Sequence, residues 1–292
     1  MTAGIGIALA FVAMLCWGVG DFSIQRSARK LGDWETLFVI TGFGTLILLP
    51  FVYDRIPSLL ADPGNGLYIL IASGLILTAA SVLDFEGLKK GKLAVIEPLW
   101  SIEIPAASFL AFFVLGDRIT GLDIVLIVLL IFGLCLVSFK EKRFSHKFFL
   151  EKGVIVAICG AFLMGGADFF LGWGSRVTDP IMANFVLNVV MALISGAFLF
   201  ASGRIFRTVG DLRANKALLL IMSICDNVAW IAYAFAMTIV PIAVATGLSE
   251  SSVIVAVLLG LFANKEKLHP HQKVGLVLAI LAAIALASVT SA

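Results

Sequence analysis

The stretch LAVIEPLWSIEIPAASFLAFFVLGDRI at residues 93–119 aligns without a gap on IAVATGLSESSVIVAVLLGLFANKEKL at residues 242–268. The offset is 149 residues throughout, and it places the charged pair at 117–118 on the charged pair at 266–267. Apolar sequence aligns easily by chance, but charged pairs at equal positions are harder to obtain in this way. We therefore interpret the two stretches as copies of one duplicated segment.

A second block agrees with this duplication. Residues 3–22 align on residues 150–169 at an offset of 147, and the same offset continues beyond the block. The matched residues are Gly6 with Gly153, Gly18 with Gly165, Asp21 with Asp168 and Arg29 with Arg176. The blocks predict a first repeat at 1–139 and a second repeat at 153–292, joined by the basic linker KEKRFSHKFFLEK at 140–152.

The composition excludes a water-soluble globule. Of the 292 residues, 61% are hydrophobic and only 14% are charged, whereas soluble domains carry about 25% charged residues. The mean hydropathy is +1.07, and continuous apolar runs reach about 18–22 residues, the length of a membrane-spanning helix. We predict an all-α, multi-pass protein of the cell membrane. Its ten expected transmembrane helices are at 3–23, 36–53, 67–87, 93–115, 120–139, 153–173, 181–202, 217–237, 241–262 and 274–290.

Basic residues alternate between the two sides of this arrangement. Of the 21 Lys and Arg residues, 18 follow odd-numbered predicted helices, and only Arg55, Arg118 and Arg176 follow even-numbered ones. Because cytoplasmic loops are enriched in Lys and Arg, this distribution places both termini outside. Five helices per repeat is an odd number, so the second repeat is expected to be inverted relative to the first. The net charge of +2 gives no indication of a nucleic-acid partner.

Local features accompany the duplication. They are Trp17-Gly18 near the end of the first predicted helix, Arg29 after it, and GDRI (116–119) and NKEKL (264–268) before helices that contain Gly133 and Gly275. With them the chain resembles, over nearly its whole length, the EamA-type ten-helix members of the drug/metabolite transporter superfamily. The resemblance implies a transporter whose central cavity lies between two inverted repeats. Helices 1, 3, 4, 6, 8 and 9 would lie near the cavity and helices 5 and 10 at the periphery. Such relatives are generally described with cytoplasmic termini, so the orientation stays open.

Acidic residues inside the predicted helices are the candidates for function. No Lys or Arg lies in any of these helices, so acids cannot in general be neutralised by basic partners there. A carboxylate in the middle of a membrane helix costs about 2.5–3.5 kcal/mol, and it is expected to face a cavity, bind a cation or hold a proton. The candidates are Asp21, Asp84, Glu86, Glu97, Glu103, Asp168, Asp226 and Glu250.

The depth of these acids in the helices separates them. We expect Glu97 and Glu250 to be protonatable cavity residues, supported by Glu103 and Asp226. Asp84 and Glu86 precede a basic loop and fit interfacial ion pairs better. The repeat-related Asp21 and Asp168 are further candidates for proton coupling, although a capping role suits them equally. A neutral, hydrogen-bonded structural carboxyl is the competing interpretation for each deep acid.

Aromatic and polar neighbours at helical spacing suggest the substrate class. A carboxylate beside an aromatic face suits an organic cation, because a cation–π contact adds about 0.5–2 kcal/mol. Aromatic residues in membrane helices also serve as packing or interface residues, and that alternative remains open. The expected binding residues are Glu97, Trp100 and Ser101, at positions i, i+3 and i+4, together with Glu103, Glu250 and the face formed by Asp226, Trp230 and Tyr233.

These observations predict a secondary transporter of small organic metabolites that works by alternating access, with proton coupling through its buried acids. Amine-bearing or cationic substrates are favoured, and a carrier of neutral or zwitterionic metabolites, with acids relaying protons, is the alternative. GVGD (18–21) and YD (53–54) resemble an intramembrane aspartyl protease, but the two aspartates should lie on opposite membrane sides. We expect no cofactor and no metal site, a small-molecule substrate and the lipid bilayer as partners, and a monomer or homodimer.

Overall fold

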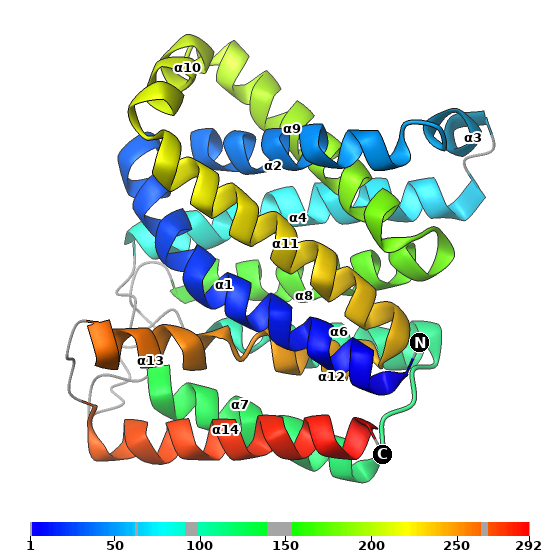
Figure 1. The fold of residues 1–292 in the computed structure, drawn as a ribbon, viewed down its shortest axis with the longest axis vertical. Helices are drawn as coiled ribbons and strands as arrows, with labels where there is room; N and C mark the ends of the chain where they lie inside the picture. Colours follow the sequence, from blue (N-terminus) through cyan, green and yellow to red (C-terminus); the bar gives the residue numbers. More distant parts are fainter. Residues whose placement is uncertain (1, 62–63, 91–98, 139–153, 264–267, 292) are drawn as a thin grey trace.

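The computed structural model describes residues 2–61, 64–90, 99–138, 154–263 and 268–291, and these residues form helices and no strands. The helices are α1 (Ala3–Leu31), α2 (Asp33–Val52), α3 (Ile56–Ala61), α4 (Gly64–Lys90), α6 (Glu103–Leu110), the π-helix η1 (Ala111–Leu115), α7 (Gly121–Ser138), α8 (Val154–Val177), α9 (Pro180–Ala201), α10 (Ile205–Ala214), α11 (Lys216–Ile239), α12 (Ile242–Ser249), α13 (Ser252–Ala263) and α14 (Pro270–Ser291). Figure 1 shows both chain termini at one end of the bundle, which we call the terminal end.

Eight of the described helices are long and apolar enough to cross a membrane, and the chain is therefore a multi-pass membrane protein. They are α1, α2, α4, α7, α8, α9, α11 and α14. Several extend past the predicted apolar limits, as α1 does by continuing to Leu31. Arg29 and Lys30 occupy its last turn, where basic side chains interact favourably with the helix dipole. The short helices α3 and α10 occupy connections that the sequence analysis treated as loops.

Two of the predicted transmembrane helices are interrupted. The helix expected at 241–262 divides into α12 and α13, and the helix expected at 93–115 has a turn at 101–102 before α6. Ser251 N–H donates to the carbonyl of Leu248 (3.2 Å), and Ile102 N–H donates to that of Leu99 (3.1 Å). These three-residue bonds are typical of a tightened helical turn. Both donors and both acceptors match at the offset of 149, so the interruptions are equivalent in the two repeats.

Glycine contacts confirm the two-repeat layout. A Cβ on Gly18 of α1 would lie 2.5 Å from the Cβ of Val255 in α13, and one on Gly165 of α8 would lie 2.7 Å from that of Ala106 in α6. Gly18 matches Gly165 at the offset of 147, and Ala106 matches Val255 at 149. The first long helix of each repeat therefore packs closely on the interrupted helix of the other repeat.

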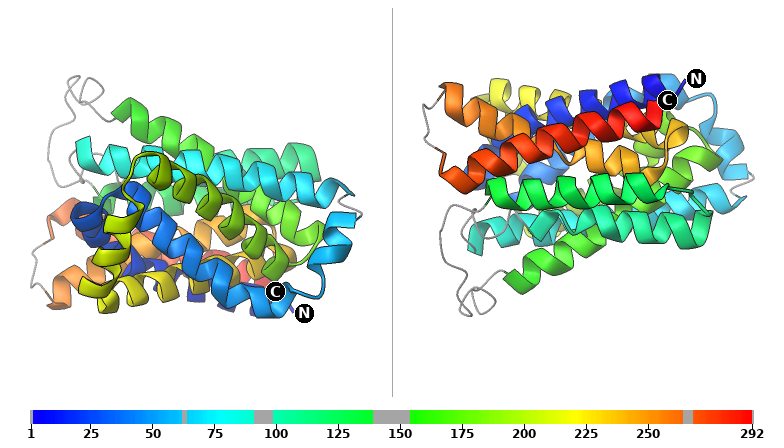
Figure 2. Two further views of the ribbon diagram at one scale, coloured as in Figure 1. Left: turned by 90° about the horizontal axis from the view of Figure 1, so that it is seen from above. Right: turned by 90° about the horizontal axis from the view of Figure 1, so that it is seen from below.

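The remaining long helices form antiparallel pairs across the repeats. α1 packs along α11, α4 along α8, and α2 along α9. Figures 1 and 2 show α7 and α14 side by side at one edge of the bundle, which fits the peripheral position that the family resemblance implied. Their close contact depends on Gly133 and Gly275, because a Cβ on Gly275 would lie 2.8 Å from the carbonyl oxygen of Gly133.

Ion pairs close both ends of the α2–α9 pair. At the terminal end, Arg55 after α2 bonds Asp179, the N-cap residue of α9, with Nη1 and Oδ2 2.5 Å apart. At the other end, Arg204 after α9 lies 3.1 Å from Glu35 in the first turn of α2. Arg55 and Arg204 match at the offset of 149. The α2–α9 pair thus has an ion pair at each end, made by arginines at repeat-related positions with acidic partners that do not match between the repeats.

Candidate functional site

Four acidic residues from four separate elements lie close together in the interior of the bundle. The carboxyl group of Glu103 interacts electrostatically with those of Glu250, Asp168 and Asp84, and Glu250 in turn interacts with Asp168 and Asp84. Glu103 is 7% exposed and Asp168 is 2% exposed. We call Glu103, Asp168, Glu250 and Asp84 the acid cluster.

The helix interruptions position two members of this cluster. Glu103 is the first residue of α6, and Glu250 occupies the turn between α12 and α13. Glu103 lies at the N-terminal end of α6, where partial positive charge makes a buried negative charge less unfavourable, whereas Glu250 lies between the C-terminal end of α12 and the start of α13. Interrupted helices at matching positions of two repeats are also a typical location for transporter binding sites.

Asp168 on α8 has one oxygen atom without a hydrogen-bond partner. Its carboxyl group lies within interaction range of the Tyr233 hydroxyl on α11, but Oδ2 is buried and unpartnered. Leaving a buried polar atom unpaired costs about 1–3 kcal/mol, and more for a charged group. Tyr233 is fully buried, and its hydroxyl lies 2.6 Å from Oγ1 of Thr246. Thr246 donates to the carbonyl of Ile242 (2.8 Å), so the Tyr233 hydroxyl is the donor to Thr246. The Tyr233 oxygen can therefore accept a further hydrogen bond.

Three aromatic rings adjoin the cluster at Tyr233. The ring of Trp17 on α1 packs edge-on against Trp230 and Tyr233, with centroid distances of 5.2 and 5.3 Å, and Trp230 and Tyr233 are 6.0 Å apart. The three rings thus contact one another beside the cluster, an arrangement compatible with packing and with a binding face. Trp17 was not among the predicted site residues. Its position four residues before Asp21, on the same face of the helix, is the sequence signal that could have identified it.

Asp226 lies at a different level of α11. It is 9% exposed and sits opposite Gly20 of α1, where a Cβ would be 3.9 Å from its backbone nitrogen. Seven residues separate it from Tyr233, which is about 10 Å along a helix. Its neighbour Asn227 accepts from Asn188 of α9 at 3.1 Å. The Asp226 carboxyl group itself interacts with the indole of Trp230, so the structure brings together these two members of the predicted face of Asp226, Trp230 and Tyr233.

The predicted binding face of Glu97, Trp100 and Ser101, on the helix expected at 93–115, is not a single face in the structure as far as it is described. Glu97 lies outside the described residues. The indole of Trp100 lies near Asp84 of α4, yet its buried Nε1 makes no hydrogen bond. Ser101 interacts with the thiol of Cys135 on α7. The described side chains of Trp100 and Ser101 thus contact different neighbouring helices.

The repeat-related aspartates also differ. Asp168 is buried in the acid cluster, whereas Asp21 is exposed on α1, although its carboxyl group also interacts electrostatically with that of Glu103. Asp84, which fitted an interfacial ion pair, is instead close to Glu103 and Glu250 because α4 packs along α8. No local sequence signal indicated this position of Asp84, since it arises from the contact between helices.

Two other expected features can be placed. Asp54 follows α2 at the terminal end, whereas Asp21 lies about 27 Å along α1 from that end, so these residues do not form the dyad that a protease requires. In the described part of the chain, no three His, Cys, Asp or Glu side chains are arranged to hold a metal ion.

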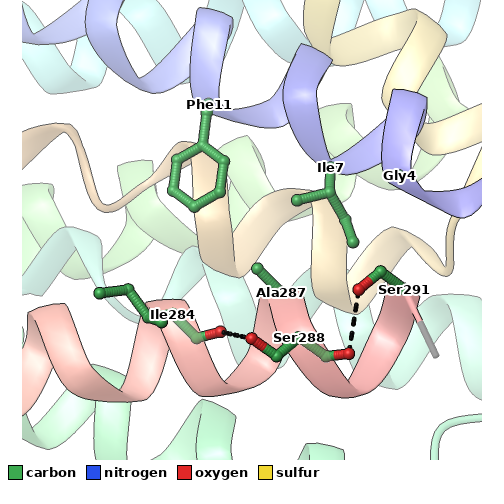
Figure 3. Close-up of a pocket in the computed structure, with 7 residues that line it drawn as sticks. All are labelled: Gly4, Ile7, Phe11, Ile284, Ala287, Ser288 and Ser291. Carbon is green, nitrogen blue, oxygen red and sulfur yellow. Dashed lines mark hydrogen bonds between the residues drawn. The ribbon is translucent and has the colours of Figure 1, made fainter.

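A groove of about 280 Å³ lies apart from the acid cluster, between α1 and α14 (Figure 3). Its lining residues are Gly4, Ile7, Phe11, Ile284, Ala287, Ser288 and Ser291. The hydroxyls of Ser288 and Ser291 donate to carbonyls of their own helix, at 2.8 and 3.0 Å. The groove thus presents mainly apolar surface, unlike the enclosed acids.

Comparisons with known proteins agree with this architecture. Residues 4–139 and 151–288 each match the sequence model of the EamA-like transporter family. A solved structure described only as "Crystal structure of protein" superposes with a TM-score of 0.75 at 14% identity, over 97% of this chain and 96% of that chain. At that identity the likeness concerns the fold alone. The search of curated proteins found no match.

Proposed function

We propose, because the chain belongs to the EamA-like transporter family, that it is a secondary transporter of small organic metabolites in the cell membrane. In this proposal the eight long helices and the two interrupted segments make ten crossings, arranged as two inverted five-helix repeats. The two repeats move relative to each other so that the acid cluster opens alternately to the two sides. Amine-bearing or cationic metabolites are the favoured substrates.

The acid cluster is the observation that supports this substrate class. Like charges repel strongly in a medium of low dielectric constant, and burying several carboxylates together without positive charge is unfavourable. Within the described membrane helices, Lys and Arg residues occur only toward the helix ends. A proton or a cationic substrate is therefore the expected source of positive charge, and the unpartnered oxygen of Asp168 is one place where it would bind.

Uptake into proteoliposomes tests the proposal. The purified protein should accumulate amines faster than sugars or organic anions when each is offered as a labelled substrate, and protein-free liposomes supply the background rate. Preferential uptake of organic anions would contradict it. Uptake of neutral or zwitterionic metabolites, driven by a pH gradient, would instead support the alternative in which the acids only relay protons.

The same proposal places both termini outside the cytoplasm. Ion pairs occupy two of the three basic residues at the terminal end, Arg55 with Asp179 and Arg176 with Asp117. The basic residues of α1, together with Arg204 and Arg207, lie at the opposite end, as expected for a cytoplasmic face. A periplasmic or extracellular reporter fused after Ala292 should be active, and a cytoplasmic reporter inactive. The reverse result would place the basic end outside.

A further inference from the structure

Arg176, near the end of α8, makes a network that joins the two repeats at the terminal end. Its guanidinium group bonds both carboxylate oxygens of Asp117, at 2.5 and 3.0 Å, and its Nε donates to the carbonyl of Met237 at 2.8 Å. A further contact reaches the carbonyl of Val240 at 3.4 Å. Asp117 Oδ2 also accepts from the backbone N–H of Ile242 at 3.0 Å. One ion pair thus holds the end of α11 and the start of α12 beside the segment that follows η1.

The elements joined in this way all carry residues of the acid cluster or of the neighbouring group of aromatic rings, Trp17, Trp230 and Tyr233. The segment with Asp117 follows α6 and η1, and Glu103 is the first residue of α6. Arg176 lies eight residues beyond Asp168 on α8, and Ile242 lies eight residues before Glu250, each about 12 Å along a helix. α11, whose last carbonyls accept from Arg176, carries Tyr233. The network therefore lies at the same distance from the acid cluster along α8 and along α12.

We propose that the Asp117–Arg176 ion pair is the gate that closes the terminal end of the transport path, and that it must separate for the acid cluster to open to that side. This inference rests on the proposed alternating access. It adds two residues that do not contact substrate but control which side of the membrane the cluster faces. Glu103, Asp168 and Glu250 bind the cation or proton, whereas Asp117 and Arg176 position the helices around them.

The geometry suits a contact that breaks and re-forms. The side chains are 27% exposed for Arg176 and 13% exposed for Asp117, so water reaches both groups. Separation would hydrate the two charges instead of leaving them buried and unpaired, which limits its cost. In the closed state each group also has a favourable dipole partner, because Arg176 binds carbonyls at a helix end and Asp117 binds an N–H at a helix start.

The ion pair of Arg55 and Asp179 provides a matched control at the same end. It also joins the two repeats, but it lies on the α2–α9 pair, whose opposite end is held by Glu35 and Arg204. Because both ends of that pair are fastened together, α2 and α9 are expected to move as one unit. Breaking or fixing the Arg55–Asp179 contact should therefore leave access to the acid cluster unchanged.

Thiol labelling tests the gate without any transport substrate. The four native cysteines are replaced, Thr246→Cys is introduced in α12, and the reconstituted protein is treated with a membrane-impermeant maleimide. Thr246 is fully buried in the closed state. Adding Asp117→Asn or Arg176→Gln should raise the labelling rate at the terminal end roughly five- to tenfold, the lower range of typical conformational coupling. Arg55→Gln should change it less than about twofold, and Ser58→Cys, exposed on α3, reports reagent access.

Reversible cross-linking tests the same gate during transport. A short bifunctional thiosulfonate joining Asp117→Cys to Arg176→Cys should abolish amine uptake until a reductant is added, whereas the same link between Arg55→Cys and Asp179→Cys should leave uptake in place. Equal labelling in all charge variants, or full uptake with positions 117 and 176 linked, would overturn the gate. If labelling responds as expected but no amine is transported, the gate stands and the proposed substrate class fails.

Discussion

The layer of Asn188 and Asn227, where α11 packs on α2 and α9, and the acid cluster are both polar regions inside one apolar bundle, and they differ in how completely their polar groups are bonded. In the α2–α9 region, Asn188 donates to Asn227 at 3.1 Å, and Asn227 donates to the carbonyl of Ile40 at 3.2 Å. In the acid cluster, Oδ2 of Asp168 has no partner and Nε1 of the adjacent Trp100 has none. Satisfied buried polar groups stabilise a fixed packing, whereas unsatisfied ones indicate that a ligand or proton completes them.

The two regions also differ in their end contacts. Ion pairs hold α2 and α9 at both ends, while the elements of the acid cluster are joined by Asp117 and Arg176 at the terminal end. The α6 and α12 segments are short, and each adjoins an interruption of its helix. We infer that α2 and α9, with α11 bonded to both through Asn227, form a framework, and that the interrupted helices with α8 form the moving, substrate-binding part.

Removing a cluster carboxyl should have the largest effect on transport. Glu250→Gln and Glu103→Gln keep the side-chain shape but remove the negative charge, so each should lower amine uptake about 10- to 100-fold, the value of one charge-assisted interaction of about 1.5–3 kcal/mol. Initial uptake rates in proteoliposomes measure this. Thermal unfolding should change little, because the charge is unfavourable in the closed bundle. Normal uptake in both variants would show that these acids are structural.

Substitution in the framework should have the opposite profile, with stability lost and the site retained. A Cβ on Gly44 of α2 would lie within 2.5 Å of Asn188 Nδ2 and closer still to Asn227 Oδ1. Gly44→Ala should therefore displace this hydrogen bond and lower the free energy of unfolding by about 1–3 kcal/mol.

Gly42 on the same helix provides the control for that change, since nothing lies within 4 Å of a Cβ there. Gly42→Ala should be neutral or stabilise by up to about 1 kcal/mol through helix propensity. Denaturant or thermal unfolding in one detergent compares the two variants. Equal stabilities for Gly44→Ala and Gly42→Ala would remove the argument for a tightly bonded framework.

The end contacts of the framework should contribute least. The Arg55 side chain is 44% exposed and that of Asp179 is 30% exposed, so Arg55→Gln should lower stability by less than about 1 kcal/mol. Arg204→Gln should cost more, because the side chain of its partner Glu35 is only 4% exposed and would be left without its cation. Unfolding curves of the two variants test this order. A larger loss of unfolding free energy in Arg55→Gln than in Arg204→Gln would show that the ion pair at the terminal end is the stronger one.

Much of the framework was predictable from the sequence because it depends on local apolar length and on the duplication. Eight of the ten expected apolar segments are long helices, and the offset of 149 also relates the turns at 101–102 and 250–251. The prolines of these two segments predict that the helices break or bend, and both segments are interrupted. Pro241, however, precedes α12 and does not lie at the interruption. The clearest local cue was the serine-rich SESS at 249–252, where Ser251 Oγ donates back to the carbonyl of Gly247 at 2.9 Å.

The composition of the acid cluster was only partly predictable. Glu103 and Glu250 were recognised because they lie deep within apolar segments. Asp84 and Asp168 lie near the expected helix ends, and only the packing of α4 along α8, and of α8 on α6, brings them to the same place. Such contacts between repeats depend on tertiary geometry, and they cannot be predicted from the hydrophobic periodicity of a single helix. Glu97 stays a prediction of the sequence.

Competition between a proton and an amine for the acid cluster is the central claim, and proton release measures it most directly. The purified protein, in weakly buffered detergent solution near neutral pH, is mixed with the amine that proteoliposomes accumulate best. The wild type should release protons in proportion to the amine bound, and the Glu250→Gln variant should release fewer. Amine binding without proton release, equally tight in the wild type and in Glu250→Gln, would contradict the account.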